Sequence, residues 1–164
     1  MNESRMAVLA GGCFWGMEEL FRELPGVTDT EVGYTGGENE YPTYENHPGH
    51  AEAILITYDP NKISYESILD FYFRIHDPTT LDQQGNDKGS SYRSAIFYTN
   101  EEEHKIAQRM IDVVDVSGRW KGPVVTKLEP LTRFWPAEES HQDYLQKNPG
   151  GYTCHAIRYD SYLK

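Results

Sequence analysis

Cysteine, long apolar runs and positive charge are all scarce in this chain, and each shortage narrows what the protein can be. The chain has two cysteines, Cys13 and Cys154, and they form no CxxC pair, so we expect neither a disulfide-rich scaffold nor a zinc site. No stretch approaches the roughly 20 apolar residues that cross a bilayer. The N-terminal residues lead into only a short apolar run, so we also expect no secretory signal.

Acidic residues outnumber basic ones, 26 against 15, which gives a formal net charge of −11. Phosphate binding needs clustered Lys and Arg, so this balance argues against a nucleic-acid partner. With no membrane segment either, we expect a cytoplasmic monomer. A persistent disulfide is rare in the cytoplasm, where paired cysteines are more often catalytic. The 164 residues suit one domain, with apolar residues spread along the whole length.

The periodicity of apolar residues predicts strands alternating with helices. Ser64 is expected to cap one helix, and Asn100 with Glu103 to form a capping box for another. Residues 76–92 have no periodicity and are expected to form a long loop. This order favours a single-domain α+β fold of the two-layer α/β type, with a mixed sheet covered by helices around a ferredoxin-like core. The expected strands are 6–9, 27–33, 51–58, 94–98 and 124–131, and two further helices are expected at 16–24 and 138–147.

The segment Gly11–Gly16 carries the most information, because it places Cys13 where a strand hands over to a helix. Unpaired N–H groups and the positive end of the helix dipole favour thiolate there, which lowers a cysteine pKa below its usual value of about 8.5. The alternative is a buried cysteine that packs as a small apolar side chain. The flanking glycines and the adjacent Phe14 and Trp15 favour a nucleophile beside an aromatic pocket.

Gly12-Cys13-Phe14-Trp15-Gly16 resembles the active-site signature of the A-type peptide methionine sulfoxide reductases. One five-residue match could be chance, but further family blocks follow in order along nearly the whole chain. These blocks are Pro42–Tyr44, Gly49–Glu52, His76–Pro78, Gln84–Asp87, Tyr92–Ile96 and His141–Leu145.

The resemblance implies roles for several residues in the reduction of methionine-S-sulfoxide, free or in oxidised proteins. Cys13 would attack the sulfoxide sulfur, while Phe14 and Trp15 hold the S-methyl group. Glu52 would act on the oxygen, because a desolvated glutamate can stay protonated near neutral pH. Tyr44 and Tyr92 would donate hydrogen bonds to the same oxygen. The preference for the S epimer of the sulfoxide is implied by the resemblance alone.

Asp87 matches a family position near the substrate, although an Asn-Asp turn explains it equally well. Without the resemblance, Glu52 would be interpreted as an exposed residue at the start of a strand. Tyr44 and Tyr92 would be interpreted as core or surface residues.

Cys154 is the one other thiol, and by the resemblance it would condense with a sulfenic acid on Cys13 to form a disulfide that thioredoxin reduces. Dithiothreitol would replace thioredoxin in vitro, and no bound cofactor is implied. Glycines before Cys154 predict a mobile C-terminal segment at about 148–164. Some family members carry a third cysteine and this chain does not, which excludes a three-thiol relay. Alternatively, Cys154 packs in a C-terminal strand at 154–159.

Two other functions remain open from the residues themselves. A Cys–His acyl-transfer hydrolase could use His50, His141 or His155, although the sequence does not show which of them approaches Cys13. A non-enzymatic redox sensor could use the Cys13–Cys154 pair as a switch. His47 and His50 have an HxxH spacing without a third ligand, so we expect loop hydrogen bonds rather than a metal.

Overall fold

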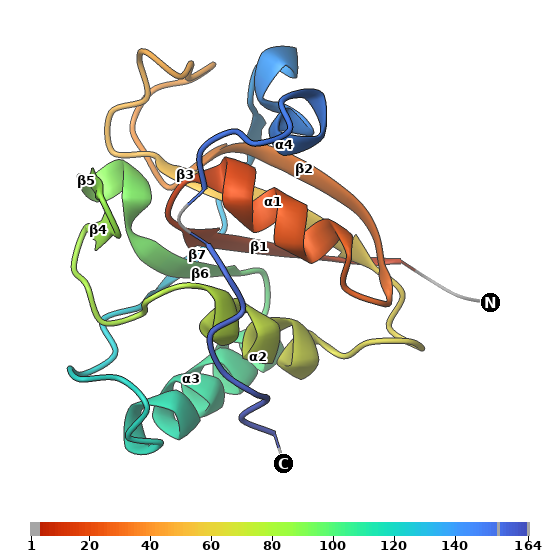
Figure 1. The fold of residues 1–164 in the computed structure, drawn as a ribbon, viewed down its shortest axis with the longest axis vertical. Helices are drawn as coiled ribbons and strands as arrows, with labels where there is room; N and C mark the ends of the chain where they lie inside the picture. The colour runs from red at the N-terminus through yellow and green to blue at the C-terminus, as the bar shows by residue number, and fades with distance from the viewer. Residues whose placement is uncertain (1–3, 154, 164) are drawn as a thin grey trace.

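The computed structural model describes residues 4–153 and 155–163, which fold into a β-sheet with helices packed on it (Figure 1). The main strands are β1 (Arg5–Gly11), β2 (Val27–Thr35), β3 (Ala51–Tyr58), β6 (Ser94–Tyr98), β7 (Lys127–Pro130) and β8 (Trp135–Pro136). The helices are α1 (Phe14–Arg22), α2 (Tyr65–Ile75), α3 (Glu101–Val116) and α4 (Tyr144–Lys147). Shorter elements are β4 (Gln83–Gln84), β5 (Asp87–Lys88) and the 3₁₀ turns η1 (Ser90–Tyr92) and η2 (Glu139–His141).

The six-stranded sheet has the order β7-β6-β1-β3-β2-β8. β1 lies inside it and pairs antiparallel with both β3 and β6, whereas β7 pairs parallel with β6. The succession β1-α1-β2-β3-α2-β6 is a βαββαβ unit. The predicted single-domain α+β fold with a mixed sheet and covering helices is therefore confirmed.

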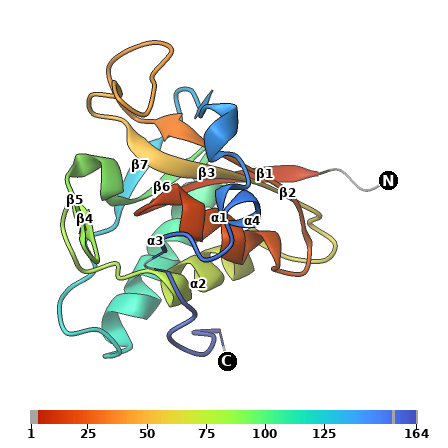
Figure 2. The same ribbon diagram turned by 45° about the horizontal axis from the view of Figure 1, so that its top comes forward.

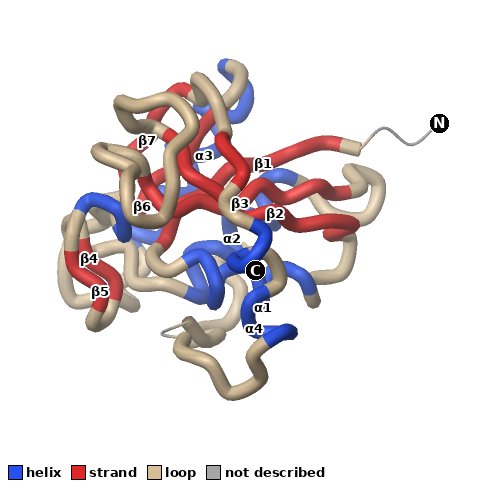
Figure 3. The backbone as a smooth tube through the Cα atoms, turned by 90° about the horizontal axis from the view of Figure 1, so that it is seen from above, coloured by secondary structure: helices blue, strands red, loops and turns tan. Residues whose placement is uncertain are grey.

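Alternate residues of β1 enter two different cores, as the two-residue repeat of a strand requires. Ala7 and Leu9 face the larger core, where α1, α2 and α3 pack on the sheet. Val8 and Ala10 face a smaller core that Leu131 and Phe134 help to close. Helices thus cover one face of the sheet and loop residues contribute to the other, and much of the chain is loop (tan in Figure 3).

Both predicted N-cap residues are present, but the predicted capping box is only half formed, because the Glu103 carboxylate accepts from the N–H of Thr99 at 2.8 Å instead of that of Asn100. The Ser64 hydroxyl accepts a hydrogen bond from the N–H of Ser67 at 3.0 Å, which begins α2. The Asn100 side chain accepts one from the N–H of Glu103 at 2.8 Å, which begins α3. Each bond satisfies an N–H group that the helix itself leaves unpaired.

Several predicted boundaries were wrong. The strand expected at 124–131 keeps only residues 127–130, and the loop expected at 76–92 contains β4, β5 and η1. The helix expected at 138–147 is broken into η2 and α4, because Asp143 adopts a left-handed conformation with φ 54°. Residues 155–159 form no strand, and Cys154 lies outside the described residues.

Within residues 4–153 and 155–163, no helix combines the length and the apolarity that a bilayer crossing requires.

Candidate functional site

Three strand ends meet at one end of the sheet and bring the candidate residues together. Gly11, the last residue of β1, pairs with Ser94, the first residue of β6. β3 runs antiparallel on the other side of β1, and Glu52 is its second residue. Because antiparallel neighbours begin where β1 ends, Cys13 after β1 and Tyr92 before β6 lie at the same end as Glu52.

Cys13 caps the N-terminus of α1, as predicted, and its side chain is 6% exposed. Gly12 makes the turn into the helix with φ 99°, a conformation that strains any other residue. A Cβ at Gly12 would also lie 2.6 Å from the side chain of Gln84. The sulfur therefore sits at the helix end whose N–H groups favour negative charge.

Glu52 is almost completely buried, with 1% of its surface exposed, so its interpretation as an exposed strand residue was wrong. The backbone N–H of Phe14, the residue after Cys13, donates a 3.1 Å hydrogen bond to Oε1 of Glu52. Burial raises the pKa of Glu52 to about 8, although the Phe14 N–H lowers it and the charge of Asp87 adds to the rise. This carboxyl group therefore keeps its proton at neutral pH and is held against the helix end that Cys13 caps.

Tyr44, in the loop before β3, and Tyr92, in η1, interact through their hydroxyl groups. Burial raises the pKa of both phenols, and the charge of Glu52 raises each further. The charge of Cys13 also contributes at Tyr44. Both phenols therefore remain protonated donors in the same electrostatic environment as Cys13 and Glu52.

Phe14 and Trp15 are consecutive in the chain but pack in different surroundings. Phe14 is 1% exposed and packs against Tyr34 in a small core, with ring centroids 5.7 Å apart. Trp15 is half-buried and stacks on Tyr144, with centroids 3.8 Å apart and planes 9° apart. An indole locked in this way offers a rigid apolar surface close to the sulfur.

His141 fixes the other edge of this indole. Trp15 Nε1–H donates a 3.0 Å hydrogen bond to Nδ1 of His141, which requires that nitrogen to be unprotonated. Burial lowers the pKa of His141, while the charges of Glu138 and Glu45 raise it. The His141 ring also stacks on Tyr44, with centroids 4.6 Å apart, and so joins the indole to the phenol.

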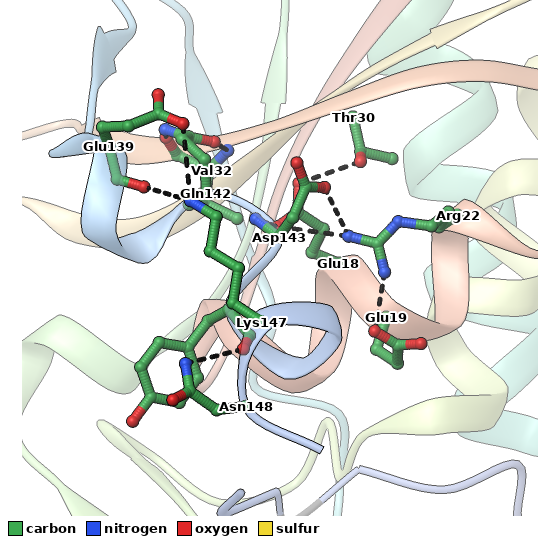
Figure 4. Close-up of polar contacts among 11 residues, drawn as sticks. Glu18, Glu19, Arg22, Thr30, Val32, Glu139, Gln142, Asp143, Lys147 and Asn148 are labelled. Carbon is green, nitrogen blue, oxygen red and sulfur yellow. Dashed lines mark hydrogen bonds and ion pairs between the residues drawn. The ribbon is translucent and has the colours of Figure 1, made fainter.

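The segment that carries His141 and Tyr144 is tied to α1, beside which α4 lies (Figure 2), through the buried carboxylate of Glu18. Glu18 accepts hydrogen bonds from the hydroxyl of Thr30 at 2.9 Å and from the N–H of Asp143 at 2.8 Å (Figure 4). Arg22 reaches the Asp143 carboxylate at 2.6 Å. These contacts hold the left-handed turn at Asp143 that breaks the expected helix.

Gln142 ties the same segment to β2. Its side chain accepts a hydrogen bond from the N–H of Val32 at 2.9 Å and donates one to the C=O of Val32 at 2.9 Å (Figure 4). Glu138 adds a contact to the loop before β3, accepting from the hydroxyl of Tyr34 at 2.9 Å and from the N–H of Tyr44 at 3.0 Å. The wall formed by Trp15 and Tyr44 is thereby held from both sides.

Asp87 lies in β5 and accepts a 3.1 Å hydrogen bond from the hydroxyl of Tyr152. Its charge contributes to the raised pKa of Glu52, Tyr44 and Tyr92, so the structure brings it to the same site. A turn-forming role alone does not account for that position.

The sequence interpretation assigned no part in the site to Glu18, Glu138, Gln142 or Tyr144, and it weighed His141 only as the partner of a hydrolase. The family block His141–Leu145 was a signal that this segment belongs to the site. The helix expected at 138–147 gave no reason to assign the contacts that its side chains make. Glu18 carried no separate signal for a role in the site, since Asp143, the partner that links it to the His141–Tyr144 segment, is 125 residues away in the sequence.

His47 and His50, the pair with HxxH spacing, make loop contacts. His47 bonds the C=O of Thr43 at 2.8 Å and the hydroxyl of Ser91 at 2.9 Å. His50 accepts from the N–H of Gly37 at 3.1 Å and bonds the C=O of Asn39 at 2.9 Å, so both of its ring nitrogens are engaged away from a catalytic role. No group of three metal-ligating side chains occurs in the described part of the chain.

The chain matches the family model described as "Peptide methionine sulfoxide reductase" over residues 5–162. It is 59% identical over 160 residues to "Peptide methionine sulfoxide reductase MsrA" of Nocardia farcinica, covering 98% of this chain and 94% of that one. The structure is similar to that of Mxr1 from Saccharomyces cerevisiae in reduced form, with a TM-score of 0.84 at 36% identity over 96% of this chain and 93% of that one. Mxr1 in complex with Trx2 matches with a TM-score of 0.62 at 27% identity, covering 96% and 91%.

A cysteine at a helix N-terminus, a protonated carboxyl group beside it and an aromatic wall fit an oxidoreductase that acts on sulfur. With the family model matched over residues 5–162, the chain belongs to the peptide methionine sulfoxide reductase family. It is a peptide-methionine (S)-S-oxide reductase. This assignment replaces the two alternatives, the Cys–His hydrolase and the non-enzymatic redox sensor.

Proposed function

We propose that the Cys13 thiolate attacks the sulfur of methionine-S-sulfoxide, in oxidised proteins or in the free amino acid. The S–O bond of the substrate breaks, the oxygen passes to Cys13 as a sulfenic acid, and methionine leaves. One proton is taken up, because thiolate, sulfoxide and proton together give sulfenic acid and sulfide. A sulfoxide oxygen transfers poorly until it is protonated, so the step needs an acid aimed at that oxygen.

The buried Glu52 is the observation that carries this mechanism. Its pKa of about 8 keeps a transferable proton on the carboxyl group at neutral pH. The Phe14 N–H fixes one carboxyl oxygen beside the helix end that Cys13 caps. Tyr44 and Tyr92 complete the set of donors around the oxygen, since both phenols stay protonated.

The aromatic residues supply the remaining requirement, a place for the S-methyl group. We assign this to Phe14 and to the face of Trp15 that its stacking partner Tyr144 leaves accessible. We assign Asp87, which accepts a hydrogen bond from Tyr152, to contacts with the rest of the substrate. No bound cofactor is needed, because the two electrons come from thiols.

Cys154 completes the proposed cycle. Its thiol attacks the Cys13 sulfenic acid, water leaves, and a Cys13–Cys154 disulfide forms. A dithiol protein then reduces this disulfide by thiol exchange, and dithiothreitol can take its place in vitro. Two observations support thioredoxin as that partner: the yeast relative forms a complex with Trx2, and Cys154 is the one other cysteine of the chain.

We further propose one catalytic domain over residues 1–164 that acts as a monomer. Its C-terminal segment at about 148–164 carries Cys154, and we propose that it moves during the cycle between the points where His155, Arg158 and Tyr162 contact the rest of the fold. The βαββαβ unit in the sheet order β6-β1-β3-β2 supports a ferredoxin-like core. The cycle needs a compartment that keeps thioredoxin reduced, and the cytoplasm remains the proposed location.

Cysteine variants test the cycle. Cys13→Ser should form no methionine from N-acetylmethionine-S-sulfoxide with either dithiothreitol or thioredoxin, because the attacking sulfur is gone. Cys154→Ser should form one equivalent of methionine and then stop when thioredoxin is the reductant. Undiminished turnover by Cys13→Ser would overturn the attack step, and normal thioredoxin-driven cycling by Cys154→Ser would overturn the disulfide step alone.

A further inference from the structure

We propose that His155 is a positioning residue that docks the C-terminal segment onto the turn that carries Cys13, and thereby speeds the closure of the Cys13–Cys154 disulfide. This inference rests on the proposed function, because it concerns the second half of that cycle. It assigns His155 no part in the reduction of the sulfoxide.

His155 is buried in a segment that is otherwise exposed. The ring is 7% exposed, whereas Thr153 and residues 156–158 are exposed. Nε2 of His155 lies 2.7 Å from the C=O of Gly11, and since a carbonyl only accepts, Nε2 carries the hydrogen. Gly11 ends β1, two residues before Cys13. Burial lowers the pKa of His155 to about 4, although the Gly11 C=O raises it, so the ring stays neutral across the working range.

Gly16 shows that this docking is close. A Cβ at Gly16 would lie 2.3 Å from Oγ1 of Thr153 and 2.4 Å from Nδ1 of His155. Gly16 is the third residue of α1, and glycine is a poorer helix former than alanine. Its backbone is helical, so no special conformation requires glycine there. The approach of the C-terminal segment does require it.

The segment is also held after its crossing over α1. At the crossing itself, Oγ1 of Thr153 accepts a 3.1 Å hydrogen bond from the N–H of His155, which fixes these two residues relative to each other. After it, the N–H of Arg158 donates to the C=O of Arg74 at 2.9 Å, which places the chain on α2 (dark blue in Figure 1). Farther on, the N–H of Tyr162 donates to the carboxylate of Asp70 at 2.6 Å.

This arrangement has a kinetic consequence. Cys154 is joined covalently to Thr153 and His155. An anchor at these two residues therefore limits how far its thiol can move from the turn that carries Cys13. A tethered reactant behaves as if it were highly concentrated, and the effect is lost when the tether is loose. Loss of the His155 anchor should therefore slow disulfide closure and leave the first chemical step unchanged.

The test follows both steps in one reaction. Fully reduced protein is mixed with one equivalent of N-acetylmethionine-S-sulfoxide and quenched at intervals with an alkylating agent. Methionine formation reports the attack by Cys13. Loss of the last free thiol reports disulfide closure. His155→Ala should form methionine at the wild-type rate and close the disulfide at least about tenfold more slowly, and thioredoxin-driven kcat should fall with it.

Further variants separate docking from general damage. His155→Gln can place an amide N–H near the position of Nε2 and should restore much of the closure rate. Thr153→Val removes one acceptor and should slow closure by a smaller factor, which gives a second reading if His155→Ala does not fold. His104→Ala, on the surface of α3, is the matched histidine control and should behave as wild type.

The outcomes are distinct. Wild-type closure in His155→Ala and Thr153→Val, with no closure in Cys154→Ser, would overturn the docking role and leave the proposed cycle intact. Equal slowing of both steps in His155→Ala would also overturn it, because the residue would then support the Cys13 turn itself. Normal thioredoxin-driven cycling in Cys154→Ser would instead remove the disulfide step on which the inference rests.

Discussion

Replacing Glu52 by glutamine should remove the pH dependence of sulfoxide reduction. Because burial raises the pKa of Glu52 to about 8, the wild-type enzyme carries its proton donor below that pH and loses it above. The single-turnover rate of methionine formation should then fall about tenfold for each pH unit above 8. Glutamine keeps the acceptor for the Phe14 N–H but has no acidic proton. The rate of Glu52→Gln at neutral pH should be lower by about 10²–10⁴ and flat through this range.

The same shift predicts a change in stability with a defined sign. Glu52 moves from 4.5 to about 8 on folding, so between these values the folded chain holds a proton that the unfolded chain has lost. The free energy of unfolding contributed by this group therefore decreases as pH rises and levels off above 8. At about 1.36 kcal/mol per pKa unit, ionising Glu52 in the folded protein costs at most roughly 5 kcal/mol. Glu52→Gln should thus match wild type at acidic pH and exceed it by up to a few kcal/mol at alkaline pH.

Two measurements check this reasoning. Rapid-mixing single turnovers from about pH 6 to about 9.5 give the rate profile, and denaturant titrations at both ends give the stability difference. Iodoacetamide alkylation of Cys13, followed over the same range, is the control and should be largely kept in Glu52→Gln, because glutamine is neutral, as the protonated carboxyl group is. A wild-type rate that stays flat above pH 8, or an unchanged rate in Glu52→Gln, would refute Glu52 as the proton donor.

Gln142→Ala removes both hydrogen bonds to the backbone of Val32, so the free energy of unfolding should fall by about 1–3 kcal/mol and KM for the sulfoxide should rise as the His141–Tyr144 segment loosens. Denaturant titration and steady-state kinetics check this, and an unchanged KM would show that the contact serves folding alone. Asn100→Ala removes the N-cap of α3 and should cost about 1 kcal/mol with kcat and KM unchanged. A fall in kcat for this variant would show that α3 contributes to the site.

The features that sequence predicted well are those that a few neighbouring residues decide. The alternation in 51–58 gave β3, and Ser64 and Asn100 gave the starts of α2 and α3. The placement of Cys13 at a helix N-terminus was also predictable, because glycines before it and an apolar stripe after it suffice. Such signals need no knowledge of what lies across the fold.

The features that sequence missed depend on distant partners. The break at Asp143 is held by Glu18 and Arg22, about 120 residues earlier in the chain, so local propensity at 138–147 favoured an unbroken helix. The burial of Glu52 likewise follows from the strands and loops that surround it. The role of this residue came from the family resemblance, and its raised pKa emerged only with the fold.

The position of β1 between two partners has a consequence for how the enzyme meets varied substrates. A strand bonded on both sides is among the last parts of a domain to open, whereas loops fluctuate at little cost. Cys13 follows this strand by two residues, whereas residues 36–50 and 76–92 reach its surroundings from segments that are largely loop. We therefore expect any adjustment to substrates of different shape to fall in those loops, while Cys13 keeps its position at the end of the sheet.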